Sequence, residues 1–234
     1  MNPMQITAFA ASILAIVFTV LLYGKGKEKE PYSPVRLMAR VAIFGAMATI
    51  LYAVPVFKFS LPIFPSFLEL HFDEIPIFIC GFAYGPVAGF LAILLKTLLK
   101  LLFNPSTTFF VGELTDIILS TVYVVIATWI YQKKRNLKGV AIGSTVATIA
   151  QVVVAMLLNV YVMIPFYAQV MGFPIPALLS LMQKAIPAIS DTGWSYAFLA
   201  VMPFNLLKDA IVIVITFLVY RSLHHLLRFD KKMA

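Results

Sequence analysis

The stretch Pro203-Phe204-Asn205-Leu206-Leu207-Lys208-Asp209 stands at the head of the apolar run Ala210–Tyr220. It places an amide, an ammonium and a carboxylate in or at the edge of a segment apolar enough to enter a membrane. A Lys or Asp at the centre of a bilayer costs roughly 2.5–3.5 kcal/mol on insertion scales, so each group needs a partner or a ligand. On a helix, Asn205 and Lys208 project from one face, whereas Asp209 is turned about 100° from Lys208. We interpret that face as one wall of a binding site.

The composition indicates an all-α integral membrane protein. Of 234 residues, 62% are hydrophobic and only 12% are charged, and several apolar runs can cross a hydrocarbon layer about 30 Å thick. These runs lack the alternation of barrel strands, which favours a helical bundle. The net charge of +8 is concentrated in short loops and reports orientation, not nucleic-acid binding. Cys80 is the single cysteine, so neither a disulfide nor a cysteine metal site can form within one chain. No residues of the sequence are singled out as metal ligands.

The chain divides into two expected parts. Residues 1–30 are predicted to form an extra N-terminal transmembrane helix, Met4–Tyr23, with a cytoplasmic linker, and residues 31–234 a six-helix membrane domain. With this topology the basic segments fall on one side of the membrane, at residues 25–40, 133–138 and 221–232. The positive-inside rule makes that side cytoplasmic. We therefore expect a multi-pass protein of the cell membrane with a cytoplasmic C-terminus.

Two features follow the linker. The span expected from Arg36 to Val56 carries Ala42 and Ala46 at the small-xxx-small spacing that lets another helix approach closely. Packing inside the bundle and contact with another subunit both fit this pattern. The loop Phe57–Phe72 is dense in proline and phenylalanine, which predicts a stiff apolar lid over a pocket mouth, with an interfacial aromatic belt as the alternative.

Charged residues flank the next turn. Lys96 and Lys100 lie near the end of one expected span, and Glu113 and Asp116 lie near the start of the following one. The four side chains should therefore lie at similar depth, where the acids also suit a helix N-terminus. A structural ion-pair cluster that closes this hairpin is one interpretation. Contact of one or two of these groups with a ligand is the other.

The last third of the chain completes the expected outer end. Asn159 lies near the outer end of the span Val140–Ile164, level with the Asn205 region, and is a candidate site residue. Residues 168–202 are too broken by proline and glycine to form a span. We expect there an external segment with a short helix lying on the membrane, before the last span begins near Pro203. A pocket at this end would open to the outside.

Six motifs follow one another between Arg36 and Leu227: Phe64-Pro65-Ser66-Phe67-Leu68, Asp73-Glu74-Ile75-Pro76, Gly85-Pro86-Val87-Ala88-Gly89, Leu94-Leu95-Lys96, Val111-Gly112-Glu113-Leu114 and Pro203-Phe204-Asn205-Leu206-Leu207-Lys208. In this order they resemble the substrate-binding (S) components of energy-coupling-factor vitamin transporters, most closely the riboflavin-specific type. The resemblance implies a six-helix core with a pocket near the outer face, no catalytic chemistry and no cofactor. Riboflavin would be the transported ligand.

The same resemblance implies roles for individual residues. Asn205, Lys208 and Asn159 would contact the flavin, whose ring carbonyls, ring nitrogens and N–H suit amide and ammonium groups. The small-residue face at Ala42 and Ala46 would dock on the transmembrane coupling subunit. Further substrate-binding residues expected from the motifs are Lys96, Glu113, Phe64 and Leu68.

The sequence contains no Gly-x-x-x-x-Gly-Lys-Ser/Thr phosphate loop, so the energy for transport must come from other subunits. The resemblance implies that these are two ATP-binding-cassette ATPases and the transmembrane coupling subunit. A small-molecule vitamin and membrane lipid complete the partners, without nucleic acid. One alternative is an S component for a pyrimidine or pyridine vitamin or precursor. An intramembrane enzyme using Glu113, Asp116, His224 and His225 would need groups roughly a bilayer apart, and a scaffold would leave the grouping of polar residues unexplained.

Overall fold

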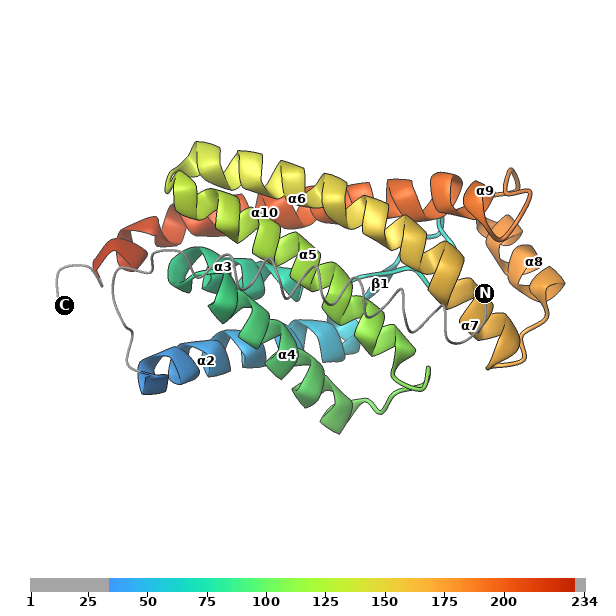
Figure 1. Cartoon of the computed structure of the whole chain (residues 1–234), viewed down its shortest axis with the longest axis horizontal. Helices are drawn as coiled ribbons and strands as arrows, with labels where there is room; N and C mark the ends of the chain where they lie inside the picture. Colours follow the sequence, from blue (N-terminus) through green and yellow to red (C-terminus); the bar gives the residue numbers. More distant parts are fainter. Residues whose placement is uncertain (1–33, 230–234) are drawn as a thin grey trace.

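The computed structural model describes residues 34–229, which form an elongated helical bundle (Figure 1). The predicted helix Met4–Tyr23 lies outside the described residues. The bundle is built from α2 (Pro34–Ala53), α3 (Glu74–Tyr84), α4 (Pro86–Phe103), α5 (Val111–Lys133), α6 (Leu137–Leu158) and α10 (Met202–Phe229). Within residues 34–229, five helical stretches are long and apolar enough to cross a membrane, and α3 is shorter. The predicted all-α membrane fold is thereby confirmed, while the domain boundary near residue 31 stays a prediction.

Shorter elements occupy the connections: η1 (Pro55–Phe57), β1 (Phe59–Ser60), β2 (Glu69–Leu70), η2 (Asn159–Met163), α7 (Ile164–Gln169), α8 (Ile175–Ala185), α9 (Trp194–Tyr196) and η3 (Ala197–Val201). Helices α6, η2 and α7 form one continuous stretch, as do α9, η3 and α10. Both η2 and η3 are π-helical turns, and they contact each other. The expected short helix of the external segment is α8.

The last long helix begins at Trp194, so the predicted start near Pro203 is wrong. Asp191 stabilises the N-terminal end of this helix, because its Oδ1 accepts hydrogen bonds from the backbone N–H groups of Gly193 (2.7 Å) and Ser195 (3.3 Å). Pro203 is tolerated inside the helix because a π turn ends two residues before it and accommodates the missing N–H. Asn205 therefore lies about three turns inside the helix, not at its head.

Aromatic side chains pack against one another within the apolar core of the bundle. Phe78 and Tyr123 are fully buried and meet edge to face, with ring centroids 4.7 Å apart. Close approach of α3 to α5 requires Gly81, since a Cβ atom there would lie 2.5 Å from Cγ2 of Thr128. This packing fixes α3 against α5, which sets the position of the acidic residues at the start of α3.

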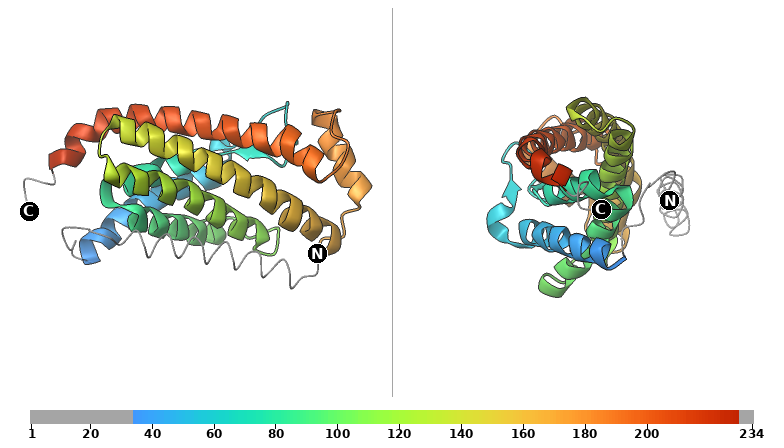
Figure 2. Two further views of the ribbon diagram at one scale, coloured as in Figure 1. Left: turned by 45° about the horizontal axis from the view of Figure 1, so that its top comes forward. Right: turned by 90° about the vertical axis from the view of Figure 1, so that its left-hand side faces the viewer.

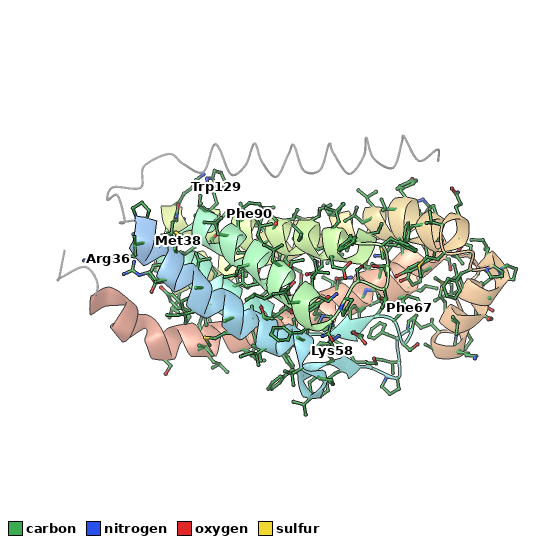
Figure 3. The ribbon with its side chains drawn as sticks, turned by 90° about the horizontal axis from the view of Figure 1, so that it is seen from below. Arg36, Met38, Lys58, Phe67, Phe90 and Trp129 are labelled. Atoms are coloured by element: carbon green, nitrogen blue, oxygen red, sulfur yellow. The ribbon has the colours of Figure 1, made fainter. Side chains whose placement is uncertain are left out.

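The two ends of the bundle differ in character. The start of α2, the turn between α5 and α6 and the last turns of α10 lie at one end, while α7, α8 and α9 lie at the other (Figures 1 and 2). Figure 3 shows Arg36 and Trp129 toward the first end and Phe67 nearer the second. The basic residues of segments 36–40 and 133–138 therefore share one end, as the expected topology requires. We call this the basic end, and the opposite one the α8 end.

Candidate functional site

The connection between α2 and α3 forms a small hairpin in which β1 pairs antiparallel with β2. Its tip folds over the last helix: the ring of Phe64 meets that of Phe204 edge to face at 5.4 Å, and Phe67 lies 6.1 Å from Tyr196. Leu68 is partly buried in the same apolar clusters. The hairpin therefore covers the helix one residue away from Asn205. This arrangement fits the predicted lid.

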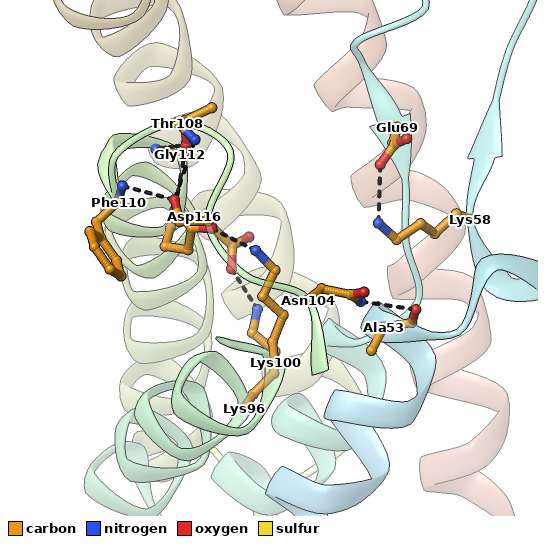
Figure 4. A network of polar contacts seen from close by, with 12 residues as sticks. Ala53, Lys58, Glu69, Lys96, Lys100, Asn104, Thr108, Phe110, Gly112 and Asp116 are labelled. Atoms are coloured by element: carbon orange, nitrogen blue, oxygen red, sulfur yellow. Dashed lines mark hydrogen bonds and ion pairs between the residues drawn. The ribbon is translucent and has the colours of Figure 1, made fainter. Parts of the chain in front are cut away.

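An ionic contact holds the two arms of the hairpin together. Nζ of Lys58 lies 3.4 Å from Oε2 of Glu69 (Figure 4). Nε2 of His71 lies 3.3 Å from the same oxygen. The hydrogen bond with His71 is the main reason that the pKa of Glu69 falls to about 2, and the charge of Lys58 adds to it against the opposing effect of burial. The His71 ring also packs against Tyr52 at 4.7 Å. The hairpin is thus tied to the end of α2.

Lys96 lies at the centre of a buried ion cluster. Its Nζ is 2.7 Å from Oδ2 of Asp73, at the start of α3, and 2.7 Å from Oδ2 of Asp116 on α5. Its side chain is 1% exposed and lies over the ring of Tyr52, 4.9 Å from the centroid. A single ammonium therefore joins three helices, and the structure confirms an ion-pair cluster at this turn.

Glu113 closes the turn between α4 and α5. Its Oε1 lies 2.5 Å from Nζ of Lys100, and its Oε2 accepts a hydrogen bond from the hydroxyl of Ser106 at 2.7 Å. Asn104 ties the same turn to α2 by donating to the backbone carbonyl of Ala53 at 3.3 Å (Figure 4). Both carboxylate oxygens of Glu113 thus have partners within the protein.

Asn205 and Lys208 lie on the last helix as predicted, but they contact different neighbours. Oδ1 of Asn205 accepts a hydrogen bond from Nε2 of Gln151 on α6 at 3.2 Å, and its Nδ2 donates to the carbonyl of Val201 at 2.8 Å. Nζ of Lys208 donates to Oε1 of Glu74 on α3 at 2.9 Å. The predicted polar face is therefore a junction between three helices.

Asn159 lies in the π turn η2 rather than beside Asn205. Its Nδ2 donates to the carbonyl of Ala155 at 2.9 Å, and its Oδ1 accepts from the hydroxyl of Tyr196 at 3.3 Å. Tyr196 in turn lies near Phe67 of the hairpin. The hairpin, η2 and the first turns of the last helix thus meet at one place.

Several residues of this site are not among those predicted from the sequence: Tyr52, Asp73, Glu74, Gln151 and Tyr196. The sequence does mark three of them as unusual, since Gln151 is an amide inside a long apolar run and Asp73 and Glu74 are adjacent acids. Nothing in the sequence distinguishes Tyr52 and Tyr196 from the many other aromatic residues of the chain.

Ala42 and Ala46 lie on the exposed face of α2, whereas Gly45 and Ala48 face the bundle. A Cβ atom on Gly45 would lie 2.8 Å from Cδ2 of Leu95 on α4. Internal packing therefore uses the other face of the small-residue pattern. The face with Ala42 and Ala46 is available to a second helix.

The described residues define an α-helical membrane protein with a buried polar site toward its α8 end. Residues 36–220 match the family model described as the substrate-specific component of ECF transporters. The chain belongs to this family. It is therefore a subunit of a transporter and not an enzyme, as predicted.

Named relatives and a solved structure resemble most of the chain. It is 28% identical over 189 residues to the riboflavin transporter RibU of Staphylococcus aureus, across 81% of this chain and 92% of the relative. It is 29% identical over 180 residues to RibU of Lactococcus lactis, an alignment that covers 75% of this chain and 87% of the relative. It is 23% identical over 186 residues to the riboflavin transporter FmnP of Bacillus subtilis, across 79% of this chain and 91% of the relative. A structure described as the S component of a bacterial ECF transporter matches with a TM-score of 0.65 and 26% identity, across 83% of this chain and 99% of the other.

Membership of the family settles the general context. The chain is a multi-pass membrane protein that works with an ECF module of membrane and ATPase subunits. The enzyme alternative also fails on placement: residues 224 and 225 lie in the last turns of α10, at the basic end, whereas Glu113 lies in the first turn of α5, toward the other end (Figure 1).

Proposed function

We propose that this chain is the substrate-capture subunit of an ATP-driven uptake transporter and that it binds riboflavin from the outside. The observation that carries the proposal is the junction of Asn205, Gln151, Lys208 and Glu74 beneath the aromatic hairpin contact of Phe64. The names of three relatives that match most of this chain support riboflavin as the vitamin.

The amide pair suits the edge of an isoalloxazine ring. This edge carries carbonyl and ring-nitrogen acceptors next to one N–H donor, and paired amides offer both kinds of group. Within residues 34–229, Oε1 of Gln151 has no hydrogen-bond partner although it is buried. It can therefore accept the ring N–H, while Asn205 and Lys208 meet the acceptors. The rings of Phe64 and Phe204 supply the apolar wall that the flavin faces need.

The other proposed site residues surround this junction. Asn159 contributes an amide beside Tyr196, and Leu68 contributes part of the apolar cover from the hairpin. Lys96 keeps one N–H donor beyond its two carboxylate partners. Glu113 belongs to the site as the group that positions Lys100 at the rim.

The orientation and the partners complete the proposal. The basic end faces the cytoplasm, which puts the C-terminus there and the hairpin outside. Vitamin capture closes the hairpin, and two ATP-binding-cassette ATPases drive release through a coupling subunit that docks on Ala42 and Ala46. The partners are the vitamin, these subunits and membrane lipid, without nucleic acid.

The test is quenching of flavin fluorescence during titration of the detergent-purified protein. Wild type should quench saturably at submicromolar riboflavin, and Asn205→Ala should weaken binding at least tenfold, or about 1.4 kcal/mol. Asn136→Ala is the matched control, because that amide caps α6 at the basic end and should leave the affinity unchanged. Absence of quenching by a folded wild-type protein would refute riboflavin and favour a pyrimidine or pyridine vitamin.

A further inference from the structure

A second polar cluster lies one helical turn deeper in the bundle than Asn205, where α3, α5, α6 and α10 meet. Its members are Glu74, Tyr123, Thr148 and Asp209, which are all buried. Asp209 follows Asn205 by four residues on the last helix, and Thr148 precedes Gln151 by three on α6. The proposed flavin site uses Oε1 of Glu74 through Lys208 but none of the other three side chains.

The members of the cluster are held in place by ordered contacts. The hydroxyl of Tyr123 donates to the backbone carbonyl of Asp209 at 3.2 Å, which fixes α5 to the last helix at this level. Oε1 of Glu74 accepts from Lys208 at 2.9 Å. The charges of Lys208 and Glu74 and the hydroxyl of Thr148 set the electrostatic surroundings of the Asp209 carboxylate. The carboxylates of Asp209 and Glu74 and the hydroxyl of Thr148, which come from three helices, are therefore near enough to influence one another.

Four oxygen atoms of the cluster are left over. Among the described residues, both carboxylate oxygens of Asp209, Oε2 of Glu74 and Oγ1 of Thr148 have no hydrogen-bond partner of normal length, although solvent does not reach them. Burying a carboxylate without a partner costs several kcal/mol, and membrane helices carry such groups where they meet a ligand or an ion. Packing alone gives no account of Asp209.

The charge balance and the donor types indicate the class of ligand. The cluster holds two carboxylates, Glu74 and Asp209, against one ammonium, Lys208, so one negative charge is in excess. The neighbouring Lys96 is already shared between Asp73 and Asp116. All four spare atoms are hard oxygens, which suit alkali and alkaline-earth cations.

A singly charged ion balances the cluster, whereas a divalent ion would leave it positive. Within residues 34–229, no group of three or more His, Cys, Asp and Glu side chains gathers to hold a metal. We propose that Asp209, Glu74 and Thr148 bind one alkali-metal cation in the interior of the bundle. This ion would stabilise the meeting point of the four helices independently of the vitamin.

The experiment measures thermal unfolding of the full-length purified protein without vitamin. Na⁺ and K⁺ are each titrated against N-methyl-D-glucamine at constant ionic strength and pH. One of the two metal ions should raise the Tm of wild type saturably, by about 4 °C or more. Asp209→Asn should abolish this dependence, and Thr148→Val, which keeps every charge, should weaken it at least fivefold. Asp191→Asn, at an exposed acid near the start of α9, keeps a side-chain acceptor oxygen and should show the same dependence of Tm on the metal ion as wild type.

Each other outcome overturns the proposal. A Tm that depends on pH but on neither metal ion would show that a proton neutralises Asp209 instead. A Tm that responds to neither would assign the spare oxygens to internal water. If Asp209→Asn does not fold, the Thr148→Val titration decides, and an unchanged response there counts against the site. Because no vitamin is present, failure here leaves the riboflavin proposal untouched.

Discussion

The ammonium of Lys208 lies 2.9 Å from Oε1 of Glu74, and this ion pair ties the last helix of the bundle to its shortest one. Both side chains are largely buried. A buried ion pair adds little net stability compared with an apolar pair of the same shape. Removing one partner, however, leaves the other charge buried without a counter-charge, which is destabilising. The pair therefore makes the position of α3 depend on the helix that also carries Asn205.

Lys208→Met should lower the free energy of unfolding by about 3–5 kcal/mol, because it leaves the Glu74 carboxylate buried and uncompensated. Adding Glu74→Gln should restore most of that loss but not vitamin binding. Thermal unfolding and flavin titration of the single and double variants measure the two effects. Lys184→Met, at an exposed lysine of α8, is the control. Equal losses at positions 208 and 184 would contradict the role of the pair.

The ion cluster around Lys96 should show a graded response. Lys96→Met should be the most destabilising change, because it leaves two carboxylates without their shared cation. Asp73→Asn should cost more than Asp116→Asn, since the Asp73 side chain is 4% exposed and that of Asp116 is 26% exposed. Comparison of Tm values tests this order. A larger loss at Asp116 would show that burial does not set the strength of the cluster.

The contact between Lys58, His71 and Glu69 predicts that acid loosens the hairpin. The pKa of Glu69 is lowered to about 2 in the folded protein, from 4.5. Its stabilising contribution is therefore complete above pH 4.5 and is lost as the pH falls toward 2. Limited proteolysis of the segment 58–69 should speed up across that window.

Glu69→Gln provides the reference for this acid effect. Its hairpin should be cleaved at a rate that changes little over the same pH range, once the activity of the protease itself is normalised. The effect in wild type should be small, because the Glu69 side chain is 41% exposed and water screens its charge. A wild-type rate that follows the variant at every pH would exclude Glu69 as the titrating group.

Phe64→Ala should speed the release of riboflavin more than it slows binding. The ring of Phe64 packs on Phe204, and its loss would weaken the contact that holds the hairpin against the last helix. We expect dissociation at least tenfold faster in stopped-flow fluorescence, with an association rate within about threefold of wild type. Phe103→Ala, at the exposed end of α4, should change neither rate. A change confined to association would argue against a lid.

Ala46→Trp should separate capture from transport. A large ring on the exposed face of α2 should block the approach of another helix without reaching the bundle interior. Riboflavin affinity of the isolated chain should stay as in wild type, while co-purification with the coupling subunit should fall at least tenfold. Leu102→Trp, on the exposed side of α4, controls for bulk. Full assembly of the Ala46 variant would place the docking surface elsewhere.

Hydropathy and helical spacing predicted the spans and the pairing at the α4–α5 turn. The span Val87–Phe103 matches α4 within one residue, and the expected cluster of two lysines with two acids is present. The contact of Gln151 with Asn205 could not be predicted, since it depends on which helices lie side by side. The start of the last helix was misplaced because Pro203 reads as a boundary, whereas the π turn before it keeps the helix continuous.

The two π turns have a consequence for how this site can vary. Each stands two residues before a proline, Pro165 or Pro203, on a helix whose deeper half is packed in the bundle. A π turn adds one residue to the ring of a helical turn. It therefore changes the direction in which the side chains of the outer half of the helix point, relative to those of the inner half. Side chains beyond it, such as Tyr196, can therefore rotate to a new facing direction while Asn205 and Asp209 keep theirs.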